Sequence, residues 1–448
     1  MSIRTANLAS MDISRRTFLQ ATGAAGLGIA FSGSAASLLA NPAGALTAAD
    51  GPQVGYGPLR PDPAGLLDLP QGFRYKVFSR HQVDTLSTGE PVPADHDGMG
   101  SFADPRGRTL LVRNHELSVS DITGGKSPVP QRPGMTYDPA QPGGTTTLLL
   151  SGDNTLLSHT ASLAGTIRNC AGGITPWGTW LTCEETEEFS GSVPHGYVFE
   201  VDPIAGGDPR PITGMGRFPH EAVAIDPRTG VAYLTEDASN PFGYVYRYLP
   251  NDTLGRAGSL HRGGRLQAMV VPGVAADLSE IDTPGTVVKG IRWVDVGQAD
   301  PPQGTSVRTT ADATRIQKAE GCWWAKGSLF FVSSFGTTTV KTHQGQVFRY
   351  DPVARTLTLV AQFGAADPFD GPDNITIAPF GTAFLCEDGD GEQFVVGLTG
   401  KGVAFPFARN ALNESEFAGA CFSPDARTMY FNIQEPGLTF AVRGPWTA

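Results

Sequence analysis

One short stretch of the sequence places a thiol close to carboxylates. Between Arg168 and Glu185 the chain reads RNCAGGITPWGTWLTCEE, in which Cys170 stands among small residues and Glu184 and Glu185 close the stretch. Its glycines and proline predict a turn, and the alternation that follows predicts a short strand ending at the glutamates. Because thiolate suits a transition metal and carboxylates suit calcium, the stretch predicts a transition metal with calcium-type neighbours rather than a zinc knuckle.

Acidic residues end most members of a set of similar predicted strands. These segments are LLVRNHE (110–116), WLTCEE (180–185), AYLTED (232–237), LFFVSS (329–334), AFLCED (383–388) and MYFNIQE (429–435). In a β-propeller the ends of the innermost strands converge on the central channel. We therefore expect the segments to be innermost strands whose terminal carboxylates line one rim. The simpler alternative is that each acid marks the turn that leaves its strand.

A second set of segments repeats at an interval that is typical of propeller blades. Three octets, GYVFEVDP, GYVYRYLP and GQVFRYDP, begin at residues 196, 243 and 345. The second interval is about twice the first, so a period of about 50 residues predicts one diverged repeat between the last two octets. With IRWVDV (291–296) in the least regular blade, the pattern predicts six blades. Segments 251–290 and 297–318 read as irregular insertions.

Composition favours the same fold class. The 448 residues include 56 Gly and 35 Pro, 17% are charged and 40% are hydrophobic, which favours many short strands around a large core. We expect residues 50–448 to form one all-β domain, a six-bladed β-propeller with irregular insertions. The formal net charge of −11 argues against nucleic acid or an anionic membrane as a partner.

The N-terminal residues predict an export signal. Ser14, Arg15 and Arg16 open the motif SRRTFL, a Gly/Ala-rich apolar run follows, and small residues stand near positions 43–49. The pattern is that of a twin-arginine signal peptide over residues 1–49. It predicts the twin-arginine export machinery as a partner, and a periplasmic or secreted protein without a stable membrane anchor. This route carries folded proteins, often with an inserted cofactor, which agrees with a metal site.

The cysteine pattern singles out one thiol. The five cysteines show no CxxC spacing, so a zinc-knuckle or thioredoxin-like motif is absent from the sequence. Four of them lie in apolar or strand-like surroundings, which predict inert buried thiols: Cys183, Cys322, Cys386 and Cys421. Cys170 is the exception because its neighbours are polar residues and glycines.

Several longer strings resemble the PhoX-type alkaline phosphatase family. They are RNHE (113–116), NCAGGITPWGTWLTCEE (169–185), GRFPHE (216–221), AEG (319–321), PDNI (372–375), CEDGDGEQF (386–394) and AGACFSPDARTMYFNIQEPG (418–437). The similarity runs from about residue 68 to about residue 446. It implies a six-bladed propeller that carries iron (Fe3+) and calcium in its channel and hydrolyses phosphate esters.

The resemblance also implies metal ligands. Cys170 corresponds to an iron thiolate, and Glu221 and Glu320 match the metal glutamates of the family. Further candidate ligands are Glu116, Glu184, Glu185, Asp373, Asn374, Glu387 and Asp388. The choice between Glu184 and Glu185 stays open, because adjacent strand residues face opposite sides. The segment from Asp388 to Glu392 has the character of a calcium loop without the spacing of an EF-hand.

Other residues are candidates for contact with substrate. His115 and His220 each stand beside a candidate glutamate, where they could support it or touch the substrate. The family pattern has an arginine two residues before the Glu320 position to hold the phosphate, whereas this chain has Lys318. Lysine keeps the charge but loses the bidentate fork. Lys318 is therefore the candidate catalytic residue, and Arg315 is a candidate to supply the missing guanidinium.

Three functions stay open on the sequence. The first is an exported phosphatase that hydrolyses a small-molecule phosphate ester at an iron and calcium cluster. The second is a calcium-dependent propeller hydrolase of the lactonase type, and the third is a noncatalytic binding propeller. Cys170 favours the first, because a hard calcium site has no use for a thiolate.

Overall fold

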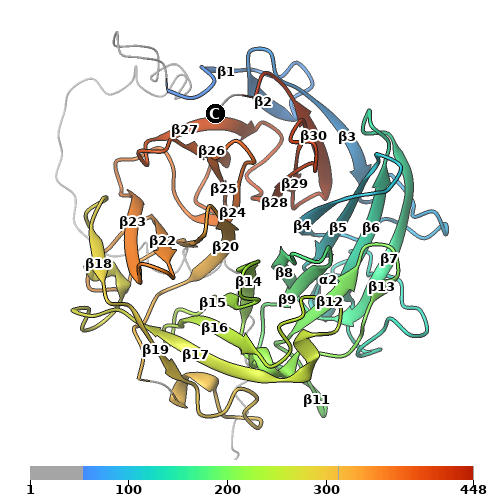
Figure 1. Cartoon of the computed structure of the whole chain (residues 1–448). Helices are drawn as coiled ribbons and strands as arrows, with labels where there is room; N and C mark the ends of the chain where they lie inside the picture. The colour runs from blue at the N-terminus through green and yellow to red at the C-terminus, as the bar shows by residue number, and fades with distance from the viewer. Residues whose placement is uncertain (1–53, 311, 447–448) are drawn as a thin grey trace, which may run out of the picture. The chain divides into compact units, whose positions relative to one another are not determined.

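Short antiparallel strands make up nearly all of the regular structure. The computed structural model describes residues 54–310 and 312–446, whose strands form six large sheets around a common axis and one two-stranded hairpin (Figure 1). The sheets are the blades of a β-propeller, so the predicted fold class is confirmed. The signal predicted over residues 1–49 lies outside the described residues. No helix among those described is long and apolar enough to cross a membrane.

The first three blades follow one another along the chain. Blade one consists of β4 (His96–Ala103), β5 (Thr109–His115), β6 (Gly143–Leu150) and β7 (Leu156–Thr166). Blade two consists of β8 (Asn169–Ile174), β9 (Trp180–Glu184), β12 (Val198–Asp202) and β13 (Gly206–Gly207). Blade three consists of β14 (His220–Ile225), β15 (Ala232–Glu236), β16 (Val245–Pro250), β17 (Gly264–Val270) and β19 (Arg292–Asp295).

The last three blades borrow strands from elsewhere in the chain. Blade four consists of β20 (Ala319–Ala325), β21 (Ser328–Ser333), β22 (Gly345–Asp351), β23 (Thr356–Phe363) and β18 (Val287–Lys289). Blade five consists of β24 (Pro372–Ile377), β25 (Ala383–Glu387), β26 (Phe394–Leu398), β27 (Ala404–Asn410), β2 (Leu67–Pro70) and β1 (Leu59–Arg60). Blade six consists of β28 (Phe417–Phe422), β29 (Met429–Ile433), β30 (Leu438–Arg443) and β3 (Arg74–Arg80).

The remaining elements are short. The hairpin pairs β10 (Phe189–Ser190) with β11 (Val193–Pro194), and α2 (Val119–Thr123) is a five-residue helix. The 3₁₀ turns are η2 (Thr213–Met215), η3 (Leu260–Arg262), η4 (Leu278–Glu280) and η5 (Val307–Thr310). These pieces join or cover the blades and leave the sheet order unchanged.

The three octets are the third strands of consecutive blades. They contain β12, β16 and β22, which belong to blades two, three and four. The expected diverged repeat between the last two octets is therefore wrong. The extra length comes from residues 251–318, which add β17, β18 and β19 and three 3₁₀ turns to the two neighbouring blades. An insertion of about one blade length mimics a missing repeat.

The strands of this set, most of which end in or just before an acid, occupy the second position of each blade. They are β5, β9, β15, β21, β25 and β29, and the innermost strands are instead β4, β8, β14, β20, β24 and β28. The expectation that the acid-ending strands are innermost is therefore wrong. The true innermost strands include small-residue sequences such as NCAGGI and FAGACF, which lack an alternating apolar pattern. Because they crowd around the axis, they favour small residues over the usual strand formers.

The hydrophobic core lies between neighbouring blades. One cluster joins Tyr233 of blade three to Leu329 and Phe348 of blade four. Another joins Phe384 of blade five to Phe431 of blade six. The other large clusters join the remaining pairs of neighbouring blades, so each blade buries both faces.

Candidate metal centre

The innermost strands of five blades carry a potential ligand at the same place. The second residue of β4, β8, β14, β20 and β24 is Asp97, Cys170, Glu221, Glu320 and Asp373, in that order. The pairing of each strand with its neighbour shifts register at this point, which indicates a β-bulge beside each ligand. Bulges re-aim side chains and are frequent beside active sites. The repeated bulge thus turns one donor per blade toward the axis.

Glycines next to these residues let adjacent blades approach closely. A Cβ on Gly98, which follows Asp97, would lie 2.7 Å from the Cys170 carbonyl oxygen of blade two. A Cβ on Gly321, which follows Glu320, would lie 2.7 Å from the Asp373 carbonyl oxygen of blade five. Only glycine fits where two backbones come this near. The ligands of neighbouring blades are therefore brought together by the residue that follows them.

Four overlapping groups of side chains result. They are Asp97–Glu116–Cys170, Cys170–Glu185–Glu221, Glu221–Glu320–Asp373 and Asp373–Asp388–Glu416, and in each the ligand atoms lie within 4.8 Å of one another. Successive groups share Cys170, Glu221 and Asp373, so the series runs through all six blades in chain order. We call these nine residues the axial cluster. It contains one thiol and eight carboxyl groups.

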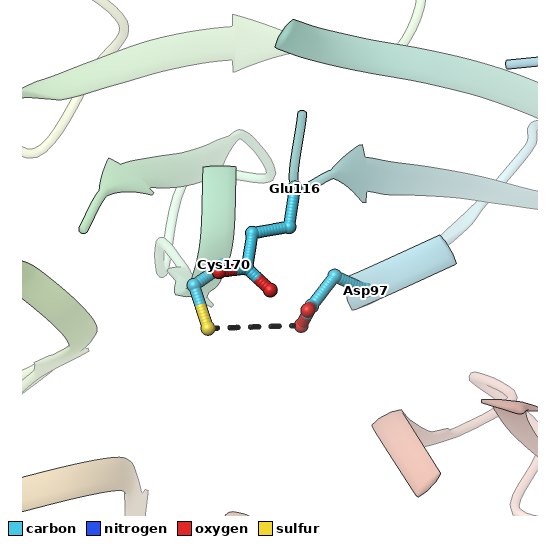
Figure 2. Close-up of side chains that lie close together, drawn as sticks. All are labelled: Asp97, Glu116 and Cys170. Atoms are coloured by element: carbon cyan, nitrogen blue, oxygen red, sulfur yellow. Dashed lines mark hydrogen bonds between the residues drawn. The ribbon is translucent and has the colours of Figure 1, made fainter. Parts of the chain in front are cut away.

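The thiol lies at the junction of the first two groups. Figure 2 shows Asp97, Glu116 and Cys170 turned toward one another, from β4, the end of β5 and β8. The Cys170 Sγ is 3.9 Å from Asp97 Oδ1 and 3.3 Å from Glu221 Oε1. Burial raises the pKa of the Cys170 thiol well above its usual value, and the surrounding carboxylates add to this, Asp97 and Glu221 foremost.

Glu184 and Glu185 have separate roles in the structure. Glu185 belongs to the axial cluster. Glu184 accepts hydrogen bonds from the backbone N–H groups of Gly196 and Tyr197, at 2.8 and 3.1 Å, just before β12 begins. It also contacts His195 Nδ1 at 2.6 Å. The structure therefore places Glu185 at the axis and uses Glu184 to hold the third strand of the blade.

The same division appears in two other blades. Glu236, at the end of β15, accepts from the Tyr244 N–H at 3.0 Å and the Tyr246 hydroxyl at 2.7 Å, and pairs with Arg308. Glu387, at the end of β25, accepts from the N–H groups of Asp370 and Phe394. In these three blades the last residue of the second strand anchors backbone, and in blades two and five the next residue belongs to the axial cluster. Glu387 is thus placed outside the axial cluster, whereas Asp388 is within it.

Lys318 is held among carboxylates at the edge of the cluster. Its Nζ is 3.0 Å from Asp237 Oδ2 and 2.8 Å from Glu320 Oε1, and its side chain is 20% exposed. Its φ of 48° lies in the left-handed region, which is uncommon for a residue other than glycine. The structure thus fixes a partly exposed ammonium beside a candidate metal ligand.

The other candidate residues are engaged away from the axial cluster. His115 contacts the Ala94 carbonyl oxygen at 2.7 Å, and His220 contacts the Gly216 carbonyl oxygen at 3.0 Å. Burial lowers the pKa of both imidazoles, that of His220 to about 3. Arg315 donates to the Phe242 carbonyl oxygen, with its guanidinium over the Tyr244 ring. Asn374 follows Asp373 in β24, opposite Cys386 of β25.

Several residues of the site were not found from the sequence. Asp97 and Glu416 belong to the axial cluster, and Asp237 holds Lys318. Four of the five ligands on the innermost strands are followed by Gly or Ala, as in Asp97-Gly98 and Glu320-Gly321. That signal would have found Asp97. Glu416 immediately precedes β28 and shows no comparable signal.

The donor chemistry of the axial cluster fits bound cations. Five of its carboxyl groups are at most 5% exposed, those of Asp97, Glu185, Glu221, Glu320 and Asp373. Buried like charges at this spacing raise one another's energy unless cations lie among them. Carboxylate oxygens suit calcium, and a thiolate added to carboxylates suits a transition metal. The residues present therefore fit a mixed metal centre.

Comparison with known proteins gives the family of the chain. The sequence profile described as "Alkaline phosphatase PhoX" matches residues 54–159 and 154–437. The chain belongs to the PhoX family. This membership supports a phosphatase, and metal dependence is general in PhoX proteins. No curated protein matched the chain.

Solved structures resemble the PhoX chain only distantly. A virginiamycin B lyase from Staphylococcus aureus is 10% identical, with 83% of this chain and 99% of that chain covered and a TM-score of 0.38. A gluconolactonase from Xanthomonas campestris is 11% identical, with coverages of 81% and 99% and a TM-score of 0.37. A protein of unknown function from Dyadobacter fermentans is 9% identical, with coverages of 84% and 100% and a TM-score of 0.42.

Proposed function

We propose that this PhoX protein is a metal-dependent phosphatase that hydrolyses small-molecule phosphate esters at the axial cluster. The observation that carries the proposal is the continuous series of donors from Asp97 to Glu416, together with family membership. Bound cations supply electrostatic stabilisation of the charge that develops on the phosphoryl oxygens. A covalent serine is not required by this chemistry.

The composition of the four groups suggests which ion each would hold. The two groups that contain Cys170 combine a thiolate with carboxylates, and we assign them to iron, as the family resemblance implies. The groups Glu221–Glu320–Asp373 and Asp373–Asp388–Glu416 offer only oxygen, and we assign them to calcium. In a lactonase-type calcium propeller, the Cys170 thiol would have no metal ion to bind.

Lys318 is the residue of this chain that we assign to the substrate. Asp237 orients its ammonium, and the partly exposed side chain can donate to an anionic phosphoryl oxygen. A lysine offers a point charge rather than a planar fork, so it attracts the phosphate with less control over its orientation.

Export remains part of the proposal. The SRRTFL motif suggests that the twin-arginine machinery carries the protein to the periplasm or the medium. The net charge of −11 does not favour nucleic acid as a partner. A small phosphate ester is therefore the proposed substrate class.

Replacement of the thiol tests the proposal. We expect Cys170→Ala to lose the iron and to reduce phosphatase activity by at least about 100-fold, while calcium is retained in part. Elemental analysis and turnover of a panel of phosphate esters provide the measurement. Cys421→Ala is the matched control, because Cys421 is also fully buried but lies outside the axial cluster.

Three results would contradict the proposed function. One is wild-type protein that is loaded with iron and calcium but hydrolyses no ester of the panel. Another is wild-type protein, exported by its own signal, that contains calcium without iron, which would favour the lactonase-type alternative. The third is exported protein with neither metal, which would favour a binding propeller.

A further inference from the structure

Blade six differs from the others in what it presents to the axis. Its innermost strand shifts register between Ala418 and Cys421, where the other five blades carry a ligand beside their bulge. The residue after its second strand is Gln434, at the position that Glu116, Glu185 and Asp388 occupy in blades one, two and five. An amide therefore stands where half of the blades have a cluster carboxylate.

Gln434 bridges two members of the axial cluster. Its Nε2 donates one hydrogen bond to Asp97 Oδ2 and another to Glu116 Oε2, both at 2.8 Å. These carboxylates come from β4 and from the end of β5, and both belong to the group that contains Cys170. The amide group has two N–H donors, so these two bonds use both.

Blade six also holds the backbone of the same ligand. The Asn432 side chain donates to the Asp97 carbonyl oxygen at 2.7 Å, and Thr439 in turn donates to Asn432 Oδ1 at 2.7 Å. Asp97 Oδ1 accepts from the Gly98 N–H at 2.7 Å and faces Cys170. Asp97 is thus fixed at its carbonyl and at both carboxylate oxygens.

A neutral donor suits this position on physical grounds. Two carboxylates that face one site repel each other, and a shared amide donor offsets the repulsion without adding a cation that competes with a metal. Another acid there would add a third negative charge. Ser334, the equivalent residue of blade four, acts in a similar way, since its Oγ donates to Glu320 Oε1 at 2.8 Å.

We propose that Gln434 is a positioning residue, which holds Asp97 and Glu116 in the geometry that binds a cation together with Cys170. The inference rests on the proposed function for its use, but it concerns binding alone. Gln434 acts through the two carboxylates and does not itself touch the ion or the substrate.

The test compares metal retention in variants of the full chain. Holo-protein is titrated with EDTA, and elemental analysis gives the concentration at which half of each metal is lost. We expect Gln434→Leu to lose one class of metal at about tenfold lower EDTA concentration than the wild type, since one positioning interaction is removed from two ligands. Gln434→Asn keeps the amide on a shorter arm and serves as a milder second variant, with a smaller shift in the same direction.

Gln346→Leu is the matched control. Gln346 lies in β22, is 1% exposed and also donates twice, to the Ile281 carbonyl oxygen and to Gln362 Oε1. Both leucine variants lose two hydrogen bonds, so both lower the melting temperature. Only the Gln434 variant is expected to shift metal retention.

Two outcomes would overturn the inference. One is wild-type metal retention in both Gln434→Leu and Gln434→Asn. The other is tighter retention in Gln434→Glu than in the wild type, which would show that the residue binds the ion through its own oxygen. Because elemental analysis needs no ester substrate, this test remains valid if the wild type hydrolyses no ester. That result would contradict the proposed function alone.

Discussion

Glu184 and Glu185 are neighbours in the sequence but have different partners. Glu185 contributes to the axial cluster, whereas Glu184 holds backbone N–H groups and His195. Neighbouring residues at a strand end point in different directions, so only one of the two acids can point toward the axis. Glu236 and Asp237 repeat the arrangement in blade three, where the second acid holds Lys318.

The pair of Glu184 and His195 predicts a pH-dependent stability. Burial lowers the pKa of His195, but the hydrogen bonds and charges of Glu184 and Asp138 outweigh it, so the net pKa is raised. A raised pKa stabilises the folded state below the ordinary value of about 6.5, and this stability is lost as the pH rises through the folded-state pKa. We expect His195→Gln to lower the free energy of unfolding by about 2 kcal/mol at pH 6.

The measurement is the difference in the free energy of unfolding between wild type and His195→Gln at two pH values. Urea unfolding at pH 6 and at pH 9 should give a smaller difference at pH 9. A difference that is constant or larger at pH 9 contradicts the assignment of a stabilising imidazolium.

Lys318 predicts an effect on phosphate affinity. We expect Lys318→Arg to lower the inhibition constant of inorganic phosphate by about three- to tenfold, because a guanidinium binds two phosphoryl oxygens at once. Lys318→Ala should raise the constant by at least as much. Steady-state inhibition of ester hydrolysis provides the measurement.

Lys326→Arg is the matched control for Lys318. Lys326 lies in the same blade and has a similar φ of 50°, but it is exposed in the turn between β20 and β21. Its replacement should leave phosphate inhibition unchanged. An equal effect in both variants would mean that phosphate binding responds to any lysine-to-arginine replacement in this blade. The position of Lys318 beside the axial cluster would then have no special role.

The innermost strands are the elements that bring the ligands together. Four of the six combine a ligand, a bulge and a following Gly or Ala, as β4 does with Asp97 and Gly98. The bulge turns the ligand toward the axis, and the glycine admits the backbone of the next blade. The candidate metal centre is therefore a property of strand packing around the ring.

Gly98→Ala tests this role of the innermost strands. The new Cβ would lie 2.7 Å from the Cys170 carbonyl oxygen, so blades one and two must separate. We expect a loss of about 1–3 kcal/mol in the free energy of unfolding, as is usual for overpacking, and lower iron content. Urea unfolding and elemental analysis measure the two effects.

Gly152→Ala is the control for added volume. Apart from its chain neighbours, no residue comes within 4 Å of a Cβ at this position, so the substitution should be tolerated. Full metal content in Gly98→Ala would show that the close approach of the blades does not set the ligand spacing.

At the scale of the whole molecule, the ring is closed by residues from both ends of the described chain. β3 pairs with β30 in blade six, and β2 pairs with β27 in blade five. Tyr56 and Phe73 also pack against Trp446, with ring centroids 5.9 and 4.8 Å apart. These contacts hold the outer parts of blades five and six together. Glu416 lies between these two blades in the sequence.

Removal of the closing strands should destabilise the propeller. A variant that begins at residue 82 lacks β1, β2 and β3, leaves an open edge on β30 and exposes Trp446. We expect it to aggregate or to melt at least about 10 °C below a variant that begins at residue 54, because several partly buried aromatic contacts are lost. Thermal unfolding of both proteins, expressed without export, is the measurement. Equal melting temperatures would contradict the closure role.

The sequence by itself determined the fold class, the number of blades and the uniqueness of one thiol. The blade count agrees with the six similar second-strand segments, one in each blade, whereas the octet spacing predicted a diverged repeat that is wrong. Cys170 stood out because its neighbours are polar and small, while the other four cysteines lie in apolar strands. The long strings around it also carried the family resemblance, which the profile match confirmed.

Only the tertiary structure decided which acids share a site. Asp97 and Glu416 lie far apart in the sequence, and Glu184 and Glu387 resembled ligands yet hold backbone instead. Residues 251–318 mimicked a lost blade because an insertion and a repeat can have equal length. The physical reason is the same in each case: ring closure and the bulge direction set where a side chain points, and neither is encoded in local periodicity.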